Sequence, residues 1–207
     1  MTVPIAENVW VDWTTSPATS RHPADLRAAA GLPPWRAQET LAGRWLLRSL
    51  LARLLPAAAQ APLVTVGNGR PVLSGWPRIG VNVSHDGGVV AAAVSLDCPV
   101  GIDVQLPPEQ IGERLARRCL RDRIADLHSL PASSRTTEFA WVWSVQEACV
   151  KAQGTGLSGR PWSIDVPVRP ITGHWCGLTW VALRDHTDIP MSCAFGERPC
   201  SAATPPT

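Results

Sequence analysis

The stretch Trp141-Val-Trp-Ser-Val-Gln-Glu-Ala-Cys-Val-Lys151 lies within residues 134–154, which we expect to form one long helix. Glycines at positions 154 and 156 suit the C-terminal end of such a helix. Trp143, Glu147 and Lys151 recur every four residues, so a helix places them on one face. A Glu–Lys pair at this spacing is usually an ordinary surface ion pair worth roughly a few tenths of a kcal/mol. The stretch therefore needs support from the rest of the chain.

Helices and strands follow one another in a similar order on both sides of residues 97–100. We expect helices near residues 23–30, 34–55 and 134–154, a further helical segment beyond residue 108, and strands near residues 7–13, 63–66, 79–83, 89–95, 100–104, 177–183 and 191–195. The glycine-containing residues 67–71 and 84–88 are expected to be connections. This order predicts an α+β fold of two subdomains, residues 1–98 and 99–207, with a site in the cleft between them.

Composition narrows the class of protein. The chain has 207 residues, of which 45% are hydrophobic and 17% charged, as expected for a globular protein. A formal net charge of +2 is too small to predict a nucleic-acid partner. No apolar run approaches the roughly 18 residues that a membrane span needs, and no secretory signal pattern is visible. We expect a cytoplasmic monomer that binds neither nucleic acids nor membranes, with six mostly structural, reduced cysteines and a loose tail at residues 199–207.

One basic residue stands apart. Of the 19 basic side chains, 18 are arginines and one is a lysine, Lys151. A GC-rich genome accounts for the arginines but not for the exception. Arginine cannot usefully release its proton, whereas lysine carries a compact ammonium group that can act as a proton donor. The sequence therefore suggests that position 151 requires a property that arginine lacks, although chance survival of one lysine is the simpler alternative.

Two shorter motifs lie upstream of this lysine. In Gly101-Ile-Asp-Val-Gln105, strand alternation places Asp103 and Gln105 on one face. A carboxylate in an apolar strand is costly unless it is paired, hydrogen-bonded or bound to a metal, and Asp103 alone cannot hold Mg²⁺. In Val83-Ser84-His85, the histidine lies at the predicted hairpin; a lone histidine there is more often an ordinary loop or core residue than a catalyst.

Taken together, the motifs point to one family. In chain order, Arg70-Pro71, Val83-Ser84-His85, Gly101-Ile102-Asp103 and Trp143-Ser-x-x-Glu-Ala-x-x-Lys151 resemble the surfactin-synthetase-activator (Sfp-like) class of 4′-phosphopantetheinyl transferases. The resemblance implies a pseudo-twofold pair of similar α/β subdomains with coenzyme A bound in the cleft. It also implies transfer of the 4′-phosphopantetheine arm of coenzyme A to a serine of an apo acyl or peptidyl carrier protein, which yields holo-carrier and 3′,5′-ADP.

The resemblance also implies roles for individual residues. Mg²⁺ would bridge the coenzyme A pyrophosphate and two protein ligands, Asp103 and Glu147. Glu147 would act as the base, or position it, at the attacking serine, and Lys151 would serve the leaving group. Residues that would contact the nucleotide phosphates are Thr40, Arg70, Ser84, His85 and Lys151.

Three positions depart from the family pattern. Gln105 replaces an acid found in many members two residues after the aspartate, so we expect water to complete the metal shell. Gln146 replaces a lysine that commonly precedes the motif glutamate. Glu39 replaces a basic residue that often precedes the matched threonine.

Two other functions stay open at this point. The chain could bind coenzyme A or a carrier without catalysis, or it could be another Mg²⁺-dependent enzyme acting on a nucleotide pyrophosphate. Residues Ile111, Leu115 and Cys119 are expected to form the buried face of the helix beyond residue 108. Its other face carries a basic stripe formed by Arg114, Arg117, Arg118 and Arg121, which is either an ordinary solvated face or a docking site for an acidic carrier.

Overall fold

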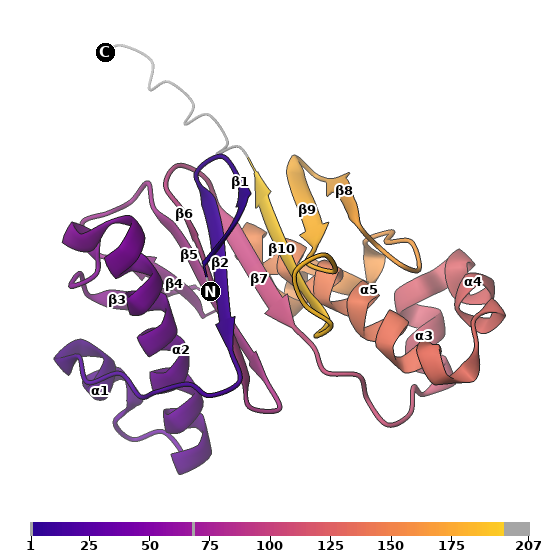
Figure 1. Cartoon of the computed structure of the whole chain (residues 1–207), viewed down its shortest axis with the longest axis horizontal. Helices are drawn as coiled ribbons and strands as arrows, with labels where there is room; N and C mark the ends of the chain where they lie inside the picture. The colour runs from indigo at the N-terminus through magenta and orange to yellow at the C-terminus, as the bar shows by residue number, and fades with distance from the viewer. Residues whose placement is uncertain (1, 68, 197–207) are drawn as a thin grey trace, which may run out of the picture.

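The computed structural model describes residues 2–67 and 69–196 and is built on two four-stranded antiparallel sheets (Figure 1). The first sheet has the order β1-β2-β6-β5 and consists of β1 (Val3–Ala6), β2 (Val9–Thr14), β6 (Val89–Ser95) and β5 (Gly80–Asp86). The second has the order β7-β10-β9-β8 and consists of β7 (Val100–Val104), β10 (Met191–Gly196), β9 (Leu178–Ala182) and β8 (Thr172–Trp175). A separate hairpin contains β3 (Leu63–Val66) and β4 (Arg70–Leu73).

The predicted long helices are confirmed. The α-helices are α1 (Pro23–Ala29), α2 (Pro34–Leu54), α3 (Glu113–Leu120), α4 (Ile124–Ser129) and α5 (Ala132–Gln153). Short 3₁₀ turns are η1 (Pro56–Ala58), η2 (Arg121–Arg123), η3 (Gly156–Gly159) and η4 (Pro161–Ser163). Helix α5 ends at Gly154, whose φ of 75° is left-handed, as a glycine at this position allows. The α+β class predicted from the sequence is therefore confirmed.

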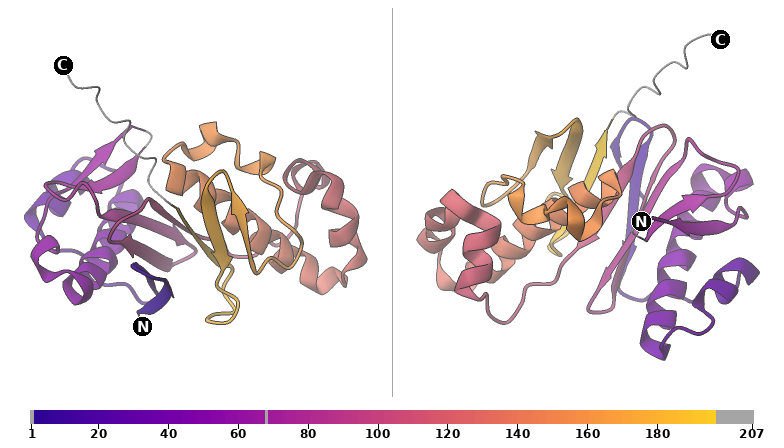
Figure 2. Two further views of the ribbon diagram at one scale, coloured as in Figure 1. Left: turned by 90° about the horizontal axis from the view of Figure 1, so that it is seen from above. Right: turned by 180° about the vertical axis from the view of Figure 1, so that it is seen from behind.

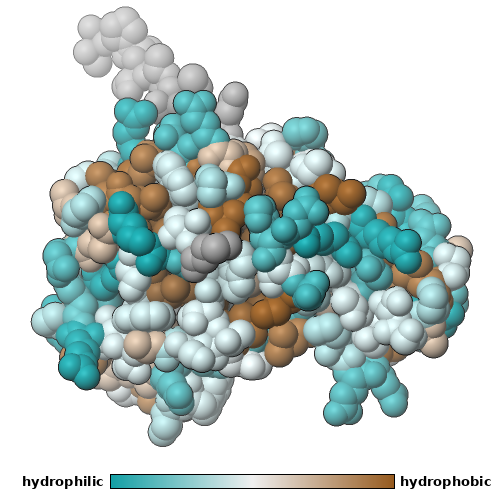
Figure 3. Space-filling view, in the orientation of Figure 1, coloured by the Kyte–Doolittle hydropathy of each residue, from teal (hydrophilic) through white to brown (hydrophobic). Residues whose placement is uncertain are grey.

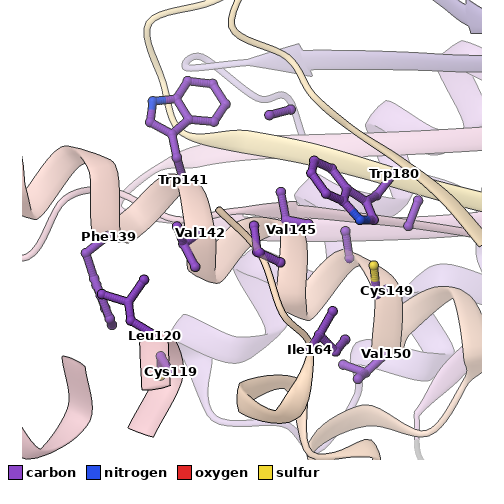
Figure 4. Packing of buried hydrophobic residues seen from close by; sticks show 14 of the residues in the cluster. Cys119, Leu120, Phe139, Trp141, Val142, Val145, Cys149, Val150, Ile164 and Trp180 are labelled. Atoms are coloured by element: carbon purple, nitrogen blue, oxygen red, sulfur yellow. The ribbon is translucent and has the colours of Figure 1, made fainter. Parts of the chain in front are cut away.

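The hydrophobic core consists of three layers: one between each sheet and its helix, and one between the two sheets. Helix α2 packs on the first sheet through Leu46, Leu47 and Leu50, and α5 packs on the second sheet together with α3 and η4 (Figure 4). The two sheets pack against each other through small and branched residues such as Val11 and Ile102. Figure 2 shows the same arrangement from two further sides, with α2 and α5 on opposite outer sides of the sheets.

The edges of the two sheets meet where β5 lies beside β7. No backbone ladder joins these two strands; side chains of β5 accept the backbone hydrogen bonds of β7. Asn82 Oδ1 lies 3.0 Å from Ile102 N, and Ser84 Oγ lies 3.3 Å from Val104 N. The chain passes from one sheet to the other between β6 and β7. We propose that the boundary between the two predicted subdomains lies in this connection, which contains residues 98 and 99.

Several boundaries differ from the predictions. The strand expected at residues 7–13 is β2, which begins at Val9 because the chain turns at Asn8, where φ is 61°, and the unpredicted strand β1 precedes that turn. Strand β5 continues to Asp86, so only Gly87 and Gly88, both with positive φ, connect it to β6. Arg70, expected in a turn, begins β4. Thr172–Trp175 forms an unpredicted strand at the sheet edge.

Helix α3 also differs from its predicted pattern. Leu115 is 47% exposed, whereas Ala116, Cys119 and Leu120 are buried against α5. The predicted spacing of four is thus confirmed for Cys119 and wrong for Leu115, while Ile111 packs against the same core from before the first turn of the helix.

The surface in the view of Figure 1 mixes polar and apolar side chains (Figure 3). No helix within the described residues is long and apolar enough to span a bilayer. The five described cysteines are free, and Cys200 and the predicted loose tail at 199–207 lie outside the described residues.

Candidate active site

A polar pocket of about 290 Å³ lies at the junction of β5, β7 and α5. Its lining consists of Val83, Ser84, His85, Asp86, Asp103, Val104, Gln105, Trp143, Glu147 and Lys151. The structure thus brings the three upstream motif residues Ser84, His85 and Asp103 to the face of α5 formed by Trp143, Glu147 and Lys151. The prediction that these three α5 residues share one face is confirmed.

A motif glycine allows this assembly. A Cβ atom on Gly101 would lie 2.1 Å from the carbonyl oxygen of Ala148 and 2.4 Å from the backbone nitrogen of Ala152. Both atoms belong to the backbone of α5, which cannot move aside as a flexible side chain could. Gly101 therefore permits α5 to pack directly on β7, close enough for side chains of the helix to reach Asp103.

Lys151 and Asp103 form an ion pair at the bottom of the pocket. Lys151 Nζ lies 2.6 Å from Asp103 Oδ1 and donates a second hydrogen bond of 3.0 Å to Ser84 Oγ. Ser84 Oγ in turn donates to Asp103 Oδ1 over 2.9 Å. Burial raises the pKa of Asp103, which is only 6% exposed, whereas the charge and hydrogen bond of Lys151 act in the opposite direction.

Glu147 is the second carboxylate of the pocket. Its Oε1 is buried and has no hydrogen-bond partner among the described residues. Burial raises the pKa of Glu147, and the negative charge of Asp103 raises it further. A buried carboxylate oxygen without a donor is costly, so this atom is available for a cation or for the proton of a substrate.

The two carboxylates fit the chemistry of Mg²⁺. This ion takes one or two carboxylates and fills its remaining octahedral positions with water and substrate phosphate oxygens. No group of three or more His, Cys, Asp or Glu side chains in the described part of the chain is arranged to hold a metal. Asp103 and Glu147, which line one pocket, would be the protein ligands, and the unpartnered Glu147 Oε1 is the atom that such an ion would satisfy.

A second pocket of about 270 Å³ adjoins the first and shares Val83, Glu147 and Lys151 with it. Its remaining lining residues are Gly69, Arg70, Pro71, Asn82, Gly154, Gly156 and Leu157. The Arg70 side chain crosses Gly154, since a Cβ atom there would lie 3.1 Å from Arg70 Cδ. Arg70, a predicted phosphate contact, therefore lines the second pocket together with Lys151, which also lines the first.

The other predicted phosphate contacts lie at the rim. His85 Nδ1 is 3.5 Å from Glu39 Oε1 of α2, and both side chains are about 40% exposed, at 41% and 39%. Thr40 follows Glu39 on α2 but is not among the residues that line the two pockets. The structure thus brings Arg70, Ser84, His85 and Lys151 together and leaves Thr40 beside the site.

The family model of the 4′-phosphopantetheinyl transferase superfamily matches residues 99–192, which include Asp103, Glu147 and Lys151. This matched region, called the superfamily domain below, contains the strand β7, the helices α3, α4 and α5, the strands β8 and β9, and the first residues of β10.

Individual relatives agree with this family. The chain is 38% identical over 125 residues to 4′-phosphopantetheinyl transferase psf-1 of Bacillus pumilus, which covers 59% of this chain and 52% of that protein. It is 30% identical over 124 residues to 4′-phosphopantetheinyl transferase Sfp of Bacillus subtilis, covering 59% and 54%. A longer match to another Bacillus subtilis 4′-phosphopantetheinyl transferase has 27% identity over 173 residues and covers 81% and 68%. The chain thus spans about half the length of the first two relatives.

One departure from the phosphopantetheinyl transferase pattern lies away from the pocket. Gln146 is completely buried, and its Nε2 donates to the carbonyl oxygens of Cys119 over 2.8 Å and Ile164 over 2.9 Å. It therefore joins α5 to the end of α3 and to η4 and does not face the pocket. Sequence position alone placed it beside Glu147, but the helix turns it away.

The superfamily domain also contains the predicted basic stripe. All four of its arginines are exposed, but three are engaged. Arg117 pairs with Glu113 over 2.7 Å, Arg118 stacks on Trp162 with 3.6 Å to the ring centroid, and Arg121 donates to the Ser163 carbonyl oxygen over 3.4 Å. Arg118 and Arg121 are thus held against η4, and Arg117 is paired within α3. The role of the stripe in carrier docking is therefore a proposal.

Sequence reasoning missed one acidic residue of the pocket. The sequence predicts a connection at residues 84–88, whereas Asp86 is the last residue of β5 and lines the pocket with Asp103 and Glu147. The alternation of β5 places Ser84 and Asp86 on one side of the strand. That alternation was the available signal, and the glycines at 87 and 88 concealed it because they extended the predicted turn.

Proposed function

We propose that the chain transfers the 4′-phosphopantetheine arm of coenzyme A to a serine of an apo-carrier protein. The observation that carries the proposal is the buried, unpartnered Glu147 Oε1, which lies in the same polar pocket as the Asp103–Lys151 ion pair. The names of the relatives support the same class of reaction.

In this reaction the serine oxygen forms a bond to the β-phosphorus of coenzyme A, and the pyrophosphate bond to 3′,5′-ADP breaks. Glu147 is placed to accept the serine proton, because it lines the pocket and burial raises its pKa. When bound, Mg²⁺ would neutralise the charge of the pyrophosphate oxygens between Asp103 and Glu147.

Lys151 and Arg70 supply positive charge to the second pocket, which Glu147 also lines. We assign Lys151 to the departing 3′,5′-ADP, to which it would donate a proton or a charge-assisted hydrogen bond. Ser84 orients Lys151 and Asp103, since its hydroxyl contacts both side chains. The rim residues His85 and Thr40 remain candidates for contact with the nucleotide phosphates.

The test is incubation of the chain with coenzyme A, Mg²⁺ and a panel of apo acyl and peptidyl carrier proteins. We expect intact mass spectrometry to show the added arm on a carrier, with equimolar release of 3′,5′-ADP. The matched control is Glu147→Gln, which keeps the shape of the side chain and removes its charge. Release of 3′,5′-ADP without a carrier would indicate a pyrophosphate hydrolase instead. Binding of coenzyme A without any product would indicate a non-catalytic binding protein.

A further inference from the structure

Asp86 adds a third carboxylate to the pocket, and it comes from a different strand than Asp103. It lines the same pocket as Asp103 and Glu147. Ser84 links the two acidic residues, because it lies on β5 two residues before Asp86 and its Oγ donates to Asp103 Oδ1 over 2.9 Å.

Gln105 holds the Asp86 carboxylate in place. Gln105 Nε2 donates to Asp86 Oδ2 over 3.0 Å, and the backbone nitrogen of Leu106 donates to the same oxygen over 2.6 Å. Both bonds go to Oδ2, so Oδ1 accepts no hydrogen bond from either residue. Two donors on one oxygen fix the direction of the carboxylate and leave the other oxygen for a further ligand.

We propose that Asp86 supplies, from β5, the negative charge that Gln105 does not supply from β7 at the cation site of this pocket. The inference rests on the proposed function. No three acidic side chains among the described residues are arranged to bind one metal directly, so Asp86 is a positioning residue that acts through water bound to the ion. Mg²⁺ usually retains several waters, and carboxylates around the first shell orient them.

The hydrogen bond between Gln105 and Asp86 makes the two positions interdependent. A carboxylate at position 105 would face Asp86 Oδ2, where the Gln105 amide now donates, and the two like charges would repel each other. Gln105→Glu alone should therefore gain less cation affinity than an added acidic ligand normally provides. With Asp86→Asn also present, position 86 carries no negative charge to repel the carboxylate introduced at position 105.

The experiment measures Mn²⁺ binding to the metal-free chain by electron paramagnetic resonance, without coenzyme A or carrier. Asp86→Asn is nearly isosteric and keeps an oxygen to accept from Leu106 N. We expect it to weaken Mn²⁺ binding about 10-fold, at the lower end of the effect of outer-shell partners. The double variant Asp86→Asn/Gln105→Glu should recover most of that loss. Asp97→Asn removes a carboxylate beyond the opposite end of β7 and should leave the Mn²⁺ affinity unchanged.

Each outcome decides between the possibilities. Mn²⁺ affinity of Asp86→Asn within about twofold of the parent, where a shell partner should cost roughly 10-fold or more, overturns the inference and leaves the proposed transfer activity standing. A loss that the double variant does not recover shows that Asp86 supports the pocket only structurally, and it also overturns the inference. Absence of both Mn²⁺ binding and carrier modification in the parent refutes the proposed function together with the inference.

Discussion

Lys151 Nζ lies 2.6 Å from Asp103 Oδ1, and this contact joins β7 to the last turn of α5. The two residues are 48 positions apart in the chain. The only lysine of the sequence is thus the partner of the carboxylate proposed to bind the metal. A cation bound by Asp103 and the ammonium group of Lys151 would share one carboxylate, so both would respond when substrate phosphates arrive.

We predict that Lys151→Arg keeps the fold and nearly normal coenzyme A binding but loses on the order of 10² in kcat, the scale for removal of a general acid. The planar guanidinium cannot reproduce the contacts of a compact ammonium with Asp103 and Ser84, and it does not release its proton. Steady-state kinetics over a range of about pH 6 to 9 and calorimetric binding of coenzyme A measure the two effects. Retention of most of the parental kcat would restrict Lys151 to electrostatic binding.

The sequence was sufficient for the parts of this site that follow from local periodicity. The spacing of Trp143, Glu147 and Lys151 identified one face of α5, and alternation placed Asp103 on the correct side of β7. The unpaired oxygen of Glu147 and the burial of Gln146 depend on how α5 packs against β7, α3 and η4, so local spacing could not show them. They are determined by contacts between segments that lie far apart in the chain.

A second prediction concerns Glu147 and pH. Burial and the charge of Asp103 raise the pKa of Glu147, so its ionised form opposes folding above that pKa when no cation is bound. Glu147→Gln should therefore increase the free energy of unfolding of the metal-free chain at neutral pH. The gain should shrink as pH falls below the raised pKa and vanish below the ordinary glutamate pKa of the unfolded chain, because the parent is then protonated in both states. Urea titrations at several pH values measure it, and a constant difference at all pH values would contradict the electrostatic cause.

The same substitution should lower kcat by about 10² to 10³, because the proposed base is removed. It should also abolish stabilisation by added Mg²⁺, which measures the ligand role separately from catalysis. A parental response to Mg²⁺ in the variant would show that Glu147 is not a ligand.

A third prediction tests the close contact of β7 and α5. Gly101→Ala should lower the free energy of unfolding by roughly 1 to 3 kcal/mol or more, as overpacking does, because its Cβ would overlap the backbone of Ala148 and Ala152. Gly112→Ala is the matched control, since nothing lies within 4 Å of the added Cβ and its φ is −62°. Equal unfolding midpoints for the two variants in urea would contradict the packing role of Gly101.

A fourth prediction concerns the carrier. Charge reversal of Arg117 and Arg121 should raise the KM for an acidic carrier at low salt, with a smaller effect at high salt, and leave the KM for coenzyme A unchanged. Arg118 is left intact because it stacks on Trp162. Reversal of the exposed Arg27 and Arg78, which lie outside the superfamily domain, is the control for net charge. An unchanged carrier KM at low salt would leave the stripe as an ordinary solvated face.

The last prediction concerns Glu39, which occupies a place where related enzymes often carry a basic residue. Its carboxylate lies 3.5 Å from His85 Nδ1, and His85 lines the pocket as a proposed phosphate contact. A carboxylate there would repel the phosphates of bound coenzyme A and would compete with them for His85. The pair is partly exposed, so solvent screens it and its effect corresponds to an exposed ion pair of roughly 0.2 to 1 kcal/mol.

We therefore expect Glu39→Gln to lower the KM for coenzyme A by about 1.4- to fivefold, which is that energy expressed as affinity. The effect should shrink at high salt because exposed charges are screened. The kcat should not change, because Glu39 does not line the pocket that contains Asp103 and Glu147. Glu7→Gln removes an exposed carboxylate in the turn between β1 and β2 and controls for net charge. A higher KM in Glu39→Gln would instead show that Glu39 orients His85 toward the phosphates, and the repulsion argument would then fail.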